Sequence, residues 1–295
     1  MRKDFLSFKD LNKEELFNLF SLTDTLKKAR PNQDNLLQGK TFVLVFEKPS
    51  LRTRVTFETG IFELGGKPIY LSPQDIGMGT RESVKDVALN LSRWVHGIIA
   101  RVFAHQNVVE LAKHANIPVI NALSDLEHPC QVLADLFTVR ERFGKFTGLK
   151  LAYIGDGNNV CHSLMLGAKL CGLEMWVATP KDYEPNNEYQ KMSAAKITND
   201  PAEAARDADI VYTDVWASMG QELEKEERLK IFSPYQINSK LMNYAKSSCL
   251  VMHCLPAHRG EEITDEVIDS PTSIVFDQSE NRLHTQKAVL STLTT

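Results

Sequence analysis

The sequence predicts an α/β fold of two domains, each a mostly parallel sheet flanked by helices, with the functional site in the cleft between them. Three observations predict it. Short apolar, β-rich runs alternate with segments of helical periodicity along the chain, and such a βα repeat produces a parallel sheet covered on both faces. The alternation restarts near residue 149 after a long helical pattern. A length of 295 residues suits two medium domains better than one large domain.

The first domain is predicted from four strands and the helices between them. Its strands are expected at 41–46, 68–71, 97–102 and 118–121, and its helices at 13–29, 52–64, 83–95 and 107–114. A longer helical pattern over about 129–143, ending before Gly144, is the candidate for a helix that joins the two domains.

The second domain repeats this pattern. Strands are expected at 149–154, 174–178, 210–213 and 250–252, and a helix follows the first of them through Leu170. The last helical pattern, 281–293, is predicted to return to the first domain.

The bulk composition argues against several classes of partner. Hydrophobic residues make up 43% and charged residues 24% of the chain, and the formal net charge is −4. This balance gives no general attraction to nucleic acid or to anionic membranes, so local charge would have to bind a phosphate ligand. No apolar run approaches the ~20 residues of a membrane span. We expect neither a secretion signal nor a transit peptide at the amino terminus.

The cysteine pattern indicates a reducing compartment. The five cysteines are scattered, odd in number and mostly set in apolar runs, and none forms a CxxC pair or a Cys/His spacing typical of zinc. We therefore expect free thiols, no metal site and a cytoplasmic location.

Ser50–Arg54 is the most informative segment, because it places hydroxyls and guanidiniums where a strand passes into a helix. Ser50 is the expected N-cap. The first backbone N–H groups of a helix have no internal partner and carry the positive end of the dipole, so an anion there would meet those amides together with Ser50, Arg52 and Thr53. The alternative is an ordinary capped helix with Arg54 paired to Glu58, which would leave Arg52 unexplained.

Gly155–Asn159 lies between a predicted strand and a helix, as a dinucleotide-binding turn would. The third glycine of that fingerprint falls on Val160, and no acidic residue ends the next strand, so a dinucleotide site is not supported. The two asparagines instead offer carboxamides at a sheet edge where small polar ligands bind. A tight turn with structural asparagines is the alternative.

Further candidates begin helices or end strands. His128 and Gln131 open the long helix near 129–143, where both can donate to a carbonyl or phosphoryl oxygen. Asp214 and Cys254 each follow a predicted strand. The alternatives are a core or capping role for His128, an N-cap role for Asp214 and a buried, inert thiol for Cys254.

Two single arginines complete the set of candidates: Arg101, just after the apolar residues 97–100, and Arg282 in the last helical pattern. For each of them the alternative is a surface salt bridge.

Together these segments resemble the aspartate/ornithine carbamoyltransferase family, and most closely its ornithine-specific members. The matching motifs occur in family order over nearly the whole chain. They are Ser50–Arg54, His128–Gln131, Gly155–Asn159, Asp214 with Ser218–Gly220, and the segment 253–256. The resemblance implies transfer of a carbamoyl group from carbamoyl phosphate to the δ-amine of L-ornithine, giving citrulline and phosphate, as in arginine biosynthesis. It implies no metal or organic cofactor, a homotrimer or a multiple of it, and an active site in the interdomain cleft.

The resemblance also implies domain limits. Residues 1–143 would form the carbamoyl-phosphate-binding domain, with the interdomain helix at about 129–143. Residues 144–278 would form the ornithine-binding domain, and 279–295 a C-terminal helix that returns to the first domain.

The implied site residues follow position by position. Phosphate would be held by Ser50, the Leu51 amide, Arg52 and Thr53. Arg101 and His128, assisted by Thr53, would polarise the carbamoyl carbonyl. The carbamoyl NH2 would meet Gln131 and the Leu255 carbonyl, and Arg282 would complete that part of the site. Ornithine would meet Asn159, Asp214, Ser218 and the Met219 amide, with Cys254 beside the δ-amine.

Two positions depart from the family pattern. Leu51 stands where the family often has Thr, which is harmless if only the amide of that residue is used. Gly77 stands where the family often presents a Gln or His across a subunit boundary, so that contact is absent or is replaced by the nearby Arg81. Aspartate, putrescine or an N-acylated ornithine as the acceptor, or an inactive ligand-binding relative, are the competing interpretations.

Overall fold

The computed structural model describes residues 3–30, 35–217 and 224–294. These residues form two compact units, which we describe separately: unit 1 comprises Met1–Phe137 and Glu280–Thr295, and unit 2 comprises Thr138–Ser279. The two limits between the units fall inside the helices α6 (Pro129–Phe143) and α13 (Val275–Thr294).

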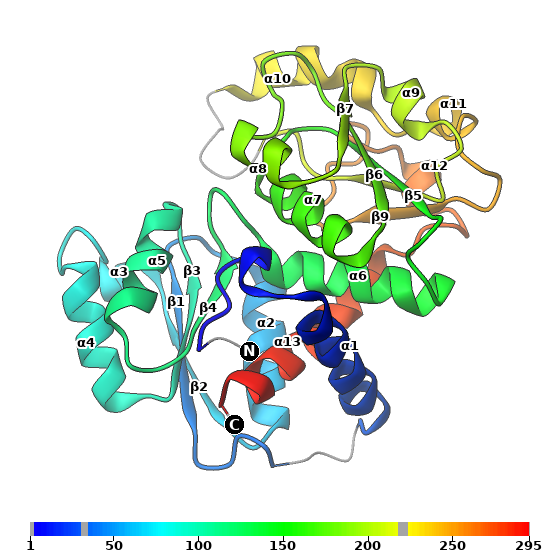
Figure 1. Ribbon diagram of the computed structural model, residues 1–295. Helices are drawn as coiled ribbons and strands as arrows, with labels where there is room; N and C mark the ends of the chain where they lie inside the picture. Colours follow the sequence, from blue (N-terminus) through cyan, green and yellow to red (C-terminus); the bar gives the residue numbers. More distant parts are fainter. Residues whose placement is uncertain (1–2, 31–34, 218–223, 295) are drawn as a thin grey trace. The chain divides into compact units, whose positions relative to one another are not determined.

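Unit 1 contains a parallel four-stranded sheet among its described residues, in the order β2-β1-β3-β4. The strands are β1 (Thr41–Phe46), β2 (Lys67–Leu71), β3 (Gly97–Arg101) and β4 (Val119–Leu123). The helices are α1 (Lys13–Lys28), α2 (Leu51–Glu63), α3 (Pro73–Ile76), α4 (Val84–Trp94) and α5 (His105–His114), with a short 3-10 turn at Phe8–Asp10. Figure 1 shows α4 and α5 on one side of this sheet, and α1, α2 and the end of α13 on the other.

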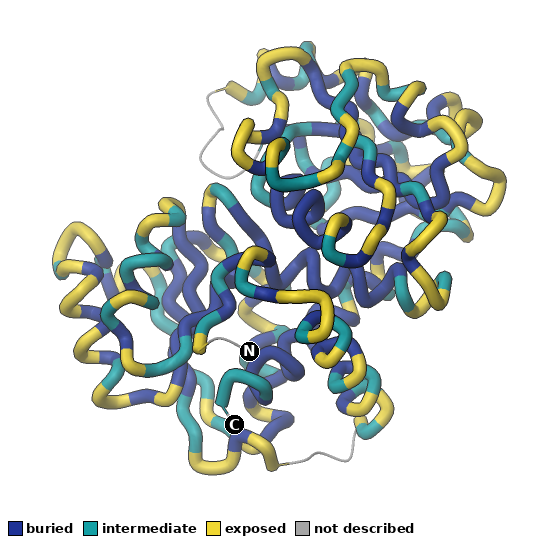
Figure 2. Tube along the Cα trace, in the orientation of Figure 1, coloured by how far each residue is buried: buried dark blue, intermediate teal, exposed yellow. Residues whose placement is uncertain are grey.

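The alternation of side chains along the strands gives unit 1 a core on both faces of its sheet. Val43 and Val45 of β1 join Ile98 and Ala100 of β3 in a buried cluster with the apolar faces of α4 and α5. On β1 the neighbouring Phe42, Leu44 and Phe46 are equally buried, and the strand appears as an unbroken dark segment in Figure 2. A strand buried on both faces reads as a continuous apolar run, as Thr41–Phe46 does.

Unit 2 contains a parallel five-stranded sheet among its described residues, in the order β7-β6-β5-β8-β9. The strands are β5 (Lys150–Ile154), β6 (Glu174–Ala178), β7 (Lys196–Thr198), β8 (Ile210–Thr213) and β9 (Leu250–His253). The helices are α7 (Asn159–Cys171), α8 (Asn187–Met192), α9 (Pro201–Ala205), α10 (Lys225–Phe232), α11 (Ser239–Met242) and α12 (Asp265–Ile268), with a 3-10 turn at Ser233–Tyr235.

The core of unit 2 is also built from alternate strand residues. Ala152 and Ile154 of β5, Val211 of β8 and Val251 of β9 lie in one buried cluster with residues of α9, α11 and α12. The helix α7 is buried on nearly every side, which agrees with its apolar sequence.

The predicted fold class is confirmed, because both sheets are parallel and flanked by helices. Most predicted strands coincide with observed ones within two residues. The sequence interpretation missed the short elements β7 and α3.

Candidate active site

Each sheet has one place where the strand order reverses, and the predicted residues gather there. In unit 1 the chain runs from β1 outward to β2 and then returns to β3 on the other side of β1. In unit 2 it runs from β5 outward to β7 and then returns to β8. Connections that leave such neighbouring strands in opposite directions open a crevice at their carboxyl ends, which is where open α/β sheets bind ligands.

The helix α2 begins at the crevice of unit 1, and Ser50 is its N-cap. The Ser50 hydroxyl accepts a hydrogen bond from the Thr53 amide at 3.2 Å, which confirms the predicted cap. Arg54 pairs with Glu58 at 3.1 Å, on the exposed side of the helix. The capped-helix alternative is therefore correct for Arg54, but it accounts for neither Arg52 nor Thr53, whose side chain is buried.

Arg282 is the best-anchored member of the group in unit 1. It is only 2% exposed. Its guanidinium donates to the Thr53 hydroxyl at 3.1 Å and to the Gln131 side-chain oxygen. With the Gln286 amide turned to satisfy its neighbours, the Gln286 oxygen accepts from the same guanidinium at 3.1 and 3.2 Å. A buried arginine bound by three side chains is not the surface salt bridge of the alternative interpretation.

Gln131 is held from both ends. Its oxygen accepts from Arg282, and its NH2 group donates to Asp135 at 2.8 Å. Gln131 and Asp135 are each 1% exposed. A carbonyl oxygen has two lone pairs, so the fixed Gln131 oxygen can still accept a hydrogen bond from a ligand amide.

Arg101 ends β3, next to the crevice, and is buried. Burial, and then the charges of Arg282 and Arg52, lower the pKa of Arg101 to about 10. Its Nε has no hydrogen-bond partner among the described residues. The guanidiniums repel one another and make this region strongly positive. They belong to Arg52, Arg101 and Arg282. A bound anion would offset this repulsion.

His128 lies just before α6 and is buried. Burial holds the pKa of His128 well below its usual value of 6.5, and the charges of Arg282, Arg101 and Arg52 act in the same direction. The ring is therefore neutral at pH 7, where it can donate one hydrogen bond without adding charge. We call Ser50, Arg52, Thr53, Arg101, His128, Gln131 and Arg282 the arginine cluster.

Asp214 organises the crevice of unit 2. It follows β8 and is 7% exposed. Its Oδ1 accepts from the Cys254 thiol at 2.8 Å and from the Val215 amide at 2.8 Å. Its Oδ2 accepts from the Asn158 NH2 group at 2.8 Å. Residues that follow three adjacent strands, β5, β8 and β9, are thus joined at one carboxylate.

These contacts decide two of the alternative interpretations. The N-cap of α10 is Glu224, so Asp214 does not cap that helix. Cys254 is buried, but its thiol is bonded to a polar group at the crevice rather than enclosed in the apolar core. We call Asn158, Asn159, Asp214 and Cys254 the carboxylate cluster.

The two halves of the chain, each with one cluster, match models of one protein family. Residues 3–141 match the model of the carbamoyl-P binding domain of aspartate/ornithine carbamoyltransferase. Residues 147–293 match the model of the Asp/Orn binding domain of the same family. The chain belongs to the aspartate/ornithine carbamoyltransferase family. The resemblance inferred from the motifs is therefore confirmed.

Relatives within this family are similar over nearly their full length. The ornithine carbamoyltransferase of Methanocaldococcus jannaschii is 52% identical over 290 residues, which cover 95% of each sequence. The crystal structure of ornithine carbamoyltransferase from Thermus thermophilus is 49% identical with a TM-score of 0.94, and the match covers all of both chains. The enzyme from Pyrococcus furiosus is 49% identical with a TM-score of 0.95, covering 97% of this chain and 95% of that one.

The remaining residues expected from the family fall in different places. Ser218 and Met219 lie outside the described residues. Leu255 directly follows Cys254 and is half-buried. Gly77, the departure from the family pattern, ends α3 in the left-handed region at φ +51°, and a Cβ there would lie 3.0 Å from the Arg81 Cβ. The local backbone therefore favours glycine at this position.

Three residues near the clusters were not proposed from the sequence. Lys48 is buried with its ammonium 4.2 Å from the centre of the Phe103 ring, and burial followed by the charge of Arg101 lowers its pKa. Asn158 donates to Asp214. Arg228 is 3% exposed, pairs with Asp156 and donates to the Trp216 carbonyl. The Lys-Pro pair before Ser50 and the doubled asparagine were visible signals, but nothing in the sequence singles out Arg228.

Potential metal ligands lie close together in two groups of the described residues, Asp214 with His253 and Cys254, and His258 with Glu261 and Glu262. In each group the ligand atoms lie within 4.8 Å of one another. Protein donors already occupy carboxylate oxygens in both: Cys254 donates to Asp214, and the His258 amide donates to Glu262. Hydrogen bonding within the protein accounts for this clustering.

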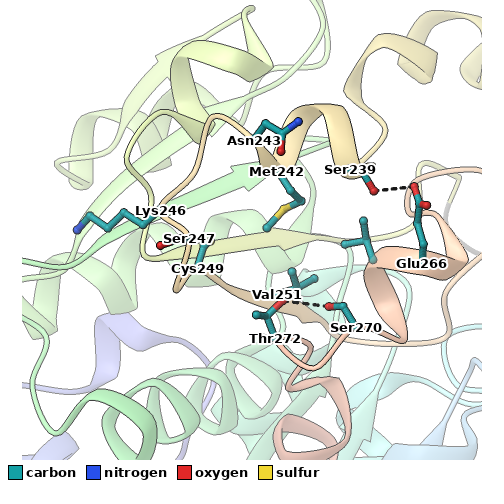
Figure 3. A pocket seen from close by; sticks show the side chains of 11 residues that line it. Ser239, Met242, Asn243, Lys246, Ser247, Cys249, Val251, Glu266, Ser270 and Thr272 are labelled. Atoms are coloured by element: carbon teal, nitrogen blue, oxygen red, sulfur yellow. Dashed lines mark hydrogen bonds between the residues drawn. The ribbon is translucent and has the colours of Figure 1, made fainter.

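A separate pocket of about 320 Å³ lies in unit 2, at the opposite end of β9 from Cys254. Figure 3 shows its wall, in which Ser239 and Glu266 are hydrogen-bonded. The lining also includes Lys246, whose ammonium is 2.7 Å from Asp209. Because the pocket is at the amino end of the strand, we do not assign it to the catalytic site.

No helix in the described ranges is both long and apolar enough to cross a membrane.

Proposed function

We propose that this protein transfers the carbamoyl group of carbamoyl phosphate to the δ-amine of L-ornithine, producing L-citrulline and phosphate. The observation that carries the proposal is the buried Arg282, which contacts Thr53 at the start of α2 and Gln131 at the start of α6. Membership of the family and about 50% identity to proteins named ornithine carbamoyltransferase support this choice of reaction.

The arginine cluster would bind carbamoyl phosphate. Ser50, the Leu51 amide, Arg52 and Thr53 would hold the phosphate, since free amides and guanidiniums at a helix start suit a phosphate dianion. Leu51 is 73% exposed, so only its amide is needed there. Arg101 and His128 would donate to the carbamoyl oxygen, while Gln131 and the Leu255 carbonyl would accept from the carbamoyl NH2.

Catalysis in this scheme is positioning plus electrostatic stabilisation. The δ-nitrogen attacks the carbamoyl carbon, the carbonyl π electrons move to oxygen, and Arg101 and His128 stabilise that oxygen. The tetrahedral species collapses as the C–O bond to phosphate breaks. Phosphate leaves with the electron pair and can take the proton that nitrogen loses. No covalent bond to the protein forms.

The carboxylate cluster would bind ornithine. Asp214 offers its carboxylate to the charged α-amino group, and Asn159, Ser218 and the Met219 amide would hold the remaining polar groups of the amino acid. Cys254 would lie beside the δ-amine. N-acylated ornithine lacks a charged α-amine, so Asp214 favours free ornithine over it. Putrescine keeps both amines and lacks the carboxylate, so it would lose the contacts proposed for the remaining polar groups.

We also propose a homotrimer or a multiple of it. Three apolar side chains of α2, Leu51, Val55 and Phe62, are 73%, 49% and 73% exposed in the isolated chain. Exposed apolar surface of this kind is typical of contact between subunits. A cytoplasmic location suits the five cysteines, all of which are free thiols.

An acceptor panel tests the reaction. Carbamoyl phosphate is supplied with ornithine, putrescine, aspartate or N-acetylornithine, and the ureido product is measured. Product with ornithine in clear excess over the others is expected. No product with ornithine, or more with another acceptor, would overturn the assignment.

An Arg52→Ala substitution tests the phosphate role. The variant should lose about 100-fold or more in kcat/KM for carbamoyl phosphate, because a charged donor to the leaving group is removed. Arg54→Ala is the matched control two residues along, where an exposed ion pair contributes about 1 kcal/mol or less. Full activity of Arg52→Ala would refute this role.

A further inference from the structure

Leu255 has an unfavourable backbone conformation. Its φ is +57°, in the left-handed region, and it has a branched side chain where glycine or asparagine is usual. Such residues persist only where the surrounding structure holds them, and they concentrate at functional sites. The contacts that hold Leu255 therefore bear on the function of the Cys254–Leu255 turn.

His253, the last residue of β9, fixes the Leu255 backbone by a hydrogen bond. The Leu255 amide donates to Nδ1 of His253 at 2.8 Å. Since Nδ1 acts as the acceptor, the ring proton must be on Nε2. The Nε2 atom lies 3.0 Å from Oε1 of Glu262, and both side chains are completely buried.

Glu262 also binds the far side of the same turn. Its Oε1 accepts from the His258 amide at 2.6 Å, so a single carboxylate oxygen joins the end of β9 to residue 258. Glu262 is itself fixed, because its carbonyl accepts from the Ile237 amide at 2.9 Å, beside the buried Ile263. The turn from His253 to His258 is thus held by a carboxylate that belongs to a rigid part of unit 2.

We propose that Glu262 is a positioning residue, which acts through His253 to fix the Cys254 thiol and the Leu255 carbonyl for catalysis. The inference rests on the proposed function, in which these two groups meet the δ-amine and the carbamoyl NH2. Glu262 contacts no substrate in that scheme. It fixes the tautomer of His253, and His253 in turn fixes the backbone of Leu255.

The expected consequence is a loss of turnover rather than of substrate binding. Glu262→Met removes the acceptor while keeping a similar volume. We expect kcat to fall about 10- to 100-fold, since misplacing a reacting group by about 1 Å has effects of that size. Inhibition by inorganic phosphate, which reports on the arginine cluster, should stay within about twofold of wild type.

Two further variants separate positioning from mere structural support. Glu262→Gln keeps an oxygen that can accept from His253 and His258, and it should recover most of the lost kcat. Glu174→Gln is the control, because Glu174 is an exposed glutamate of the same unit that pairs with Lys196 at 3.0 Å and has no part in this turn. Its kcat should equal that of wild type.

A double-mutant cycle covers the case in which Glu262→Met does not fold. His253→Asn keeps an acceptor near Leu255 but cannot reach Glu262. Glu262→Ala, a smaller truncation that also removes the acceptor, is the second member of the cycle. If Glu262 acts through His253, adding Glu262→Ala to His253→Asn should cause a much smaller further loss of kcat than Glu262→Ala causes alone.

If the proposed function is wrong, the wild-type protein will not carbamoylate ornithine, so that failure can be told apart from failure of the proposal about Glu262. With an active wild type, unchanged kcat in folded Glu262→Met overturns the proposal. So does a loss of kcat that only matches the lost fraction of folded protein, measured by circular dichroism. Fully additive losses in the double variant would also overturn it.

Discussion

At the scale of single residues, the arginine cluster keeps the same charge over a range of pH in which the amine of the proposed substrate changes its protonation. Burial beside Arg282, Arg101 and Arg52 holds the pKa of His128 well below 6.5. The pKa of Arg101, although lowered, stays at about 10. Between pH 7 and 8 His128 stays neutral and Arg101 stays charged, so this part of the site presents nearly constant electrostatics.

Because the arginine cluster keeps its charge, the pH dependence of kcat/KM should report the titration of the ornithine δ-amine. Its unperturbed pKa is about 10.4, like that of lysine, and only the neutral form can attack. If Asp214 and Cys254 accept hydrogen bonds from the neutral amine, kcat/KM for ornithine should rise with pH, by up to about tenfold per unit. Steady-state kinetics from pH 6 to 9 measures this.

The control for that profile is His128→Gln, which should be slower than wild type but show the same rise between pH 7 and 9. A flat profile from pH 6 to 9 in the wild type would rule out selection of the neutral amine. The thiol of Cys254 already donates to Asp214, so its lone pairs remain available to accept.

At the scale of elements, the turn between β5 and α7 is constrained by close packing. A Cβ added to Gly157 would lie 2.3 Å from the Pro185 nitrogen and 2.6 Å from the Tyr183 carbonyl oxygen. The Gly157 amide also donates to that carbonyl oxygen at 3.0 Å. Glycine is required at this position because the two backbones lie in contact.

Gly157→Ala should therefore displace the turn that carries Asn158 and Asn159. We expect KM for ornithine to rise about tenfold or more, and the free energy of unfolding to fall by about 1–3 kcal/mol, the usual cost of overpacking. Steady-state kinetics and chemical denaturation measure the two effects.

Gly148→Ala is the comparison for this variant, because Gly148 has φ +82° and no atom within 4 Å of a built Cβ. It should lower stability by about 1 kcal/mol and leave KM unchanged. Equal KM values for the two variants would show that close packing at Gly157 does not position the ornithine site.

Much of the secondary structure was predictable from the sequence, because local residue patterns determine it. The apolar run 41–46 and the hydroxyl at Ser50 depend only on periodicity and capping, and both were located correctly. The short strand β7 (Lys196–Thr198) is half-exposed at a sheet edge and has no apolar run to reveal it. The pairing of Asp156 with Arg228 joins residues far apart in the chain, and no local signal carries it.

The same distinction applies to the candidate site. Strand ends and helix starts identified Arg101, His128 and Asp214 as candidates, since parallel strands place their carboxyl ends at one edge. The Asn158 side chain both caps α7 and contacts Asp214, and that arrangement is decided by three-dimensional geometry. The positioning of Leu255 by His253 and Glu262 is likewise invisible without coordinates.

At the scale of the whole molecule, buried neutral histidines make stability depend on pH. Burial lowers the pKa of three histidines of unit 1, His105, His128 and His284. Below pH 6.5 the unfolded chain binds protons at these positions that the folded state does not bind. The free energy of unfolding should therefore decrease as pH falls, by up to about 1.4 kcal/mol per pH unit for each histidine.

Calorimetry at pH 7.5, 6.5 and 5.5 tests this expectation. Tm should be similar at the two higher values and fall by several degrees at pH 5.5. His284→Gln should reduce the fall, because it removes one of the three groups. A Tm that does not change between pH 7.5 and 5.5 would contradict it.

The reversal of strand order in both sheets also has an evolutionary consequence. In the proposed function each unit carries its own ligand-binding residues, so a change in the loops after β5, β8 and β9 would alter the amine that is accepted and leave phosphate binding unchanged. New acceptor specificities could therefore arise by rebuilding a few loops in one half of the gene. A chimera that keeps residues 1–137 and 280–295 of this chain and takes the rest from a relative with another acceptor should inherit the acceptor of that relative.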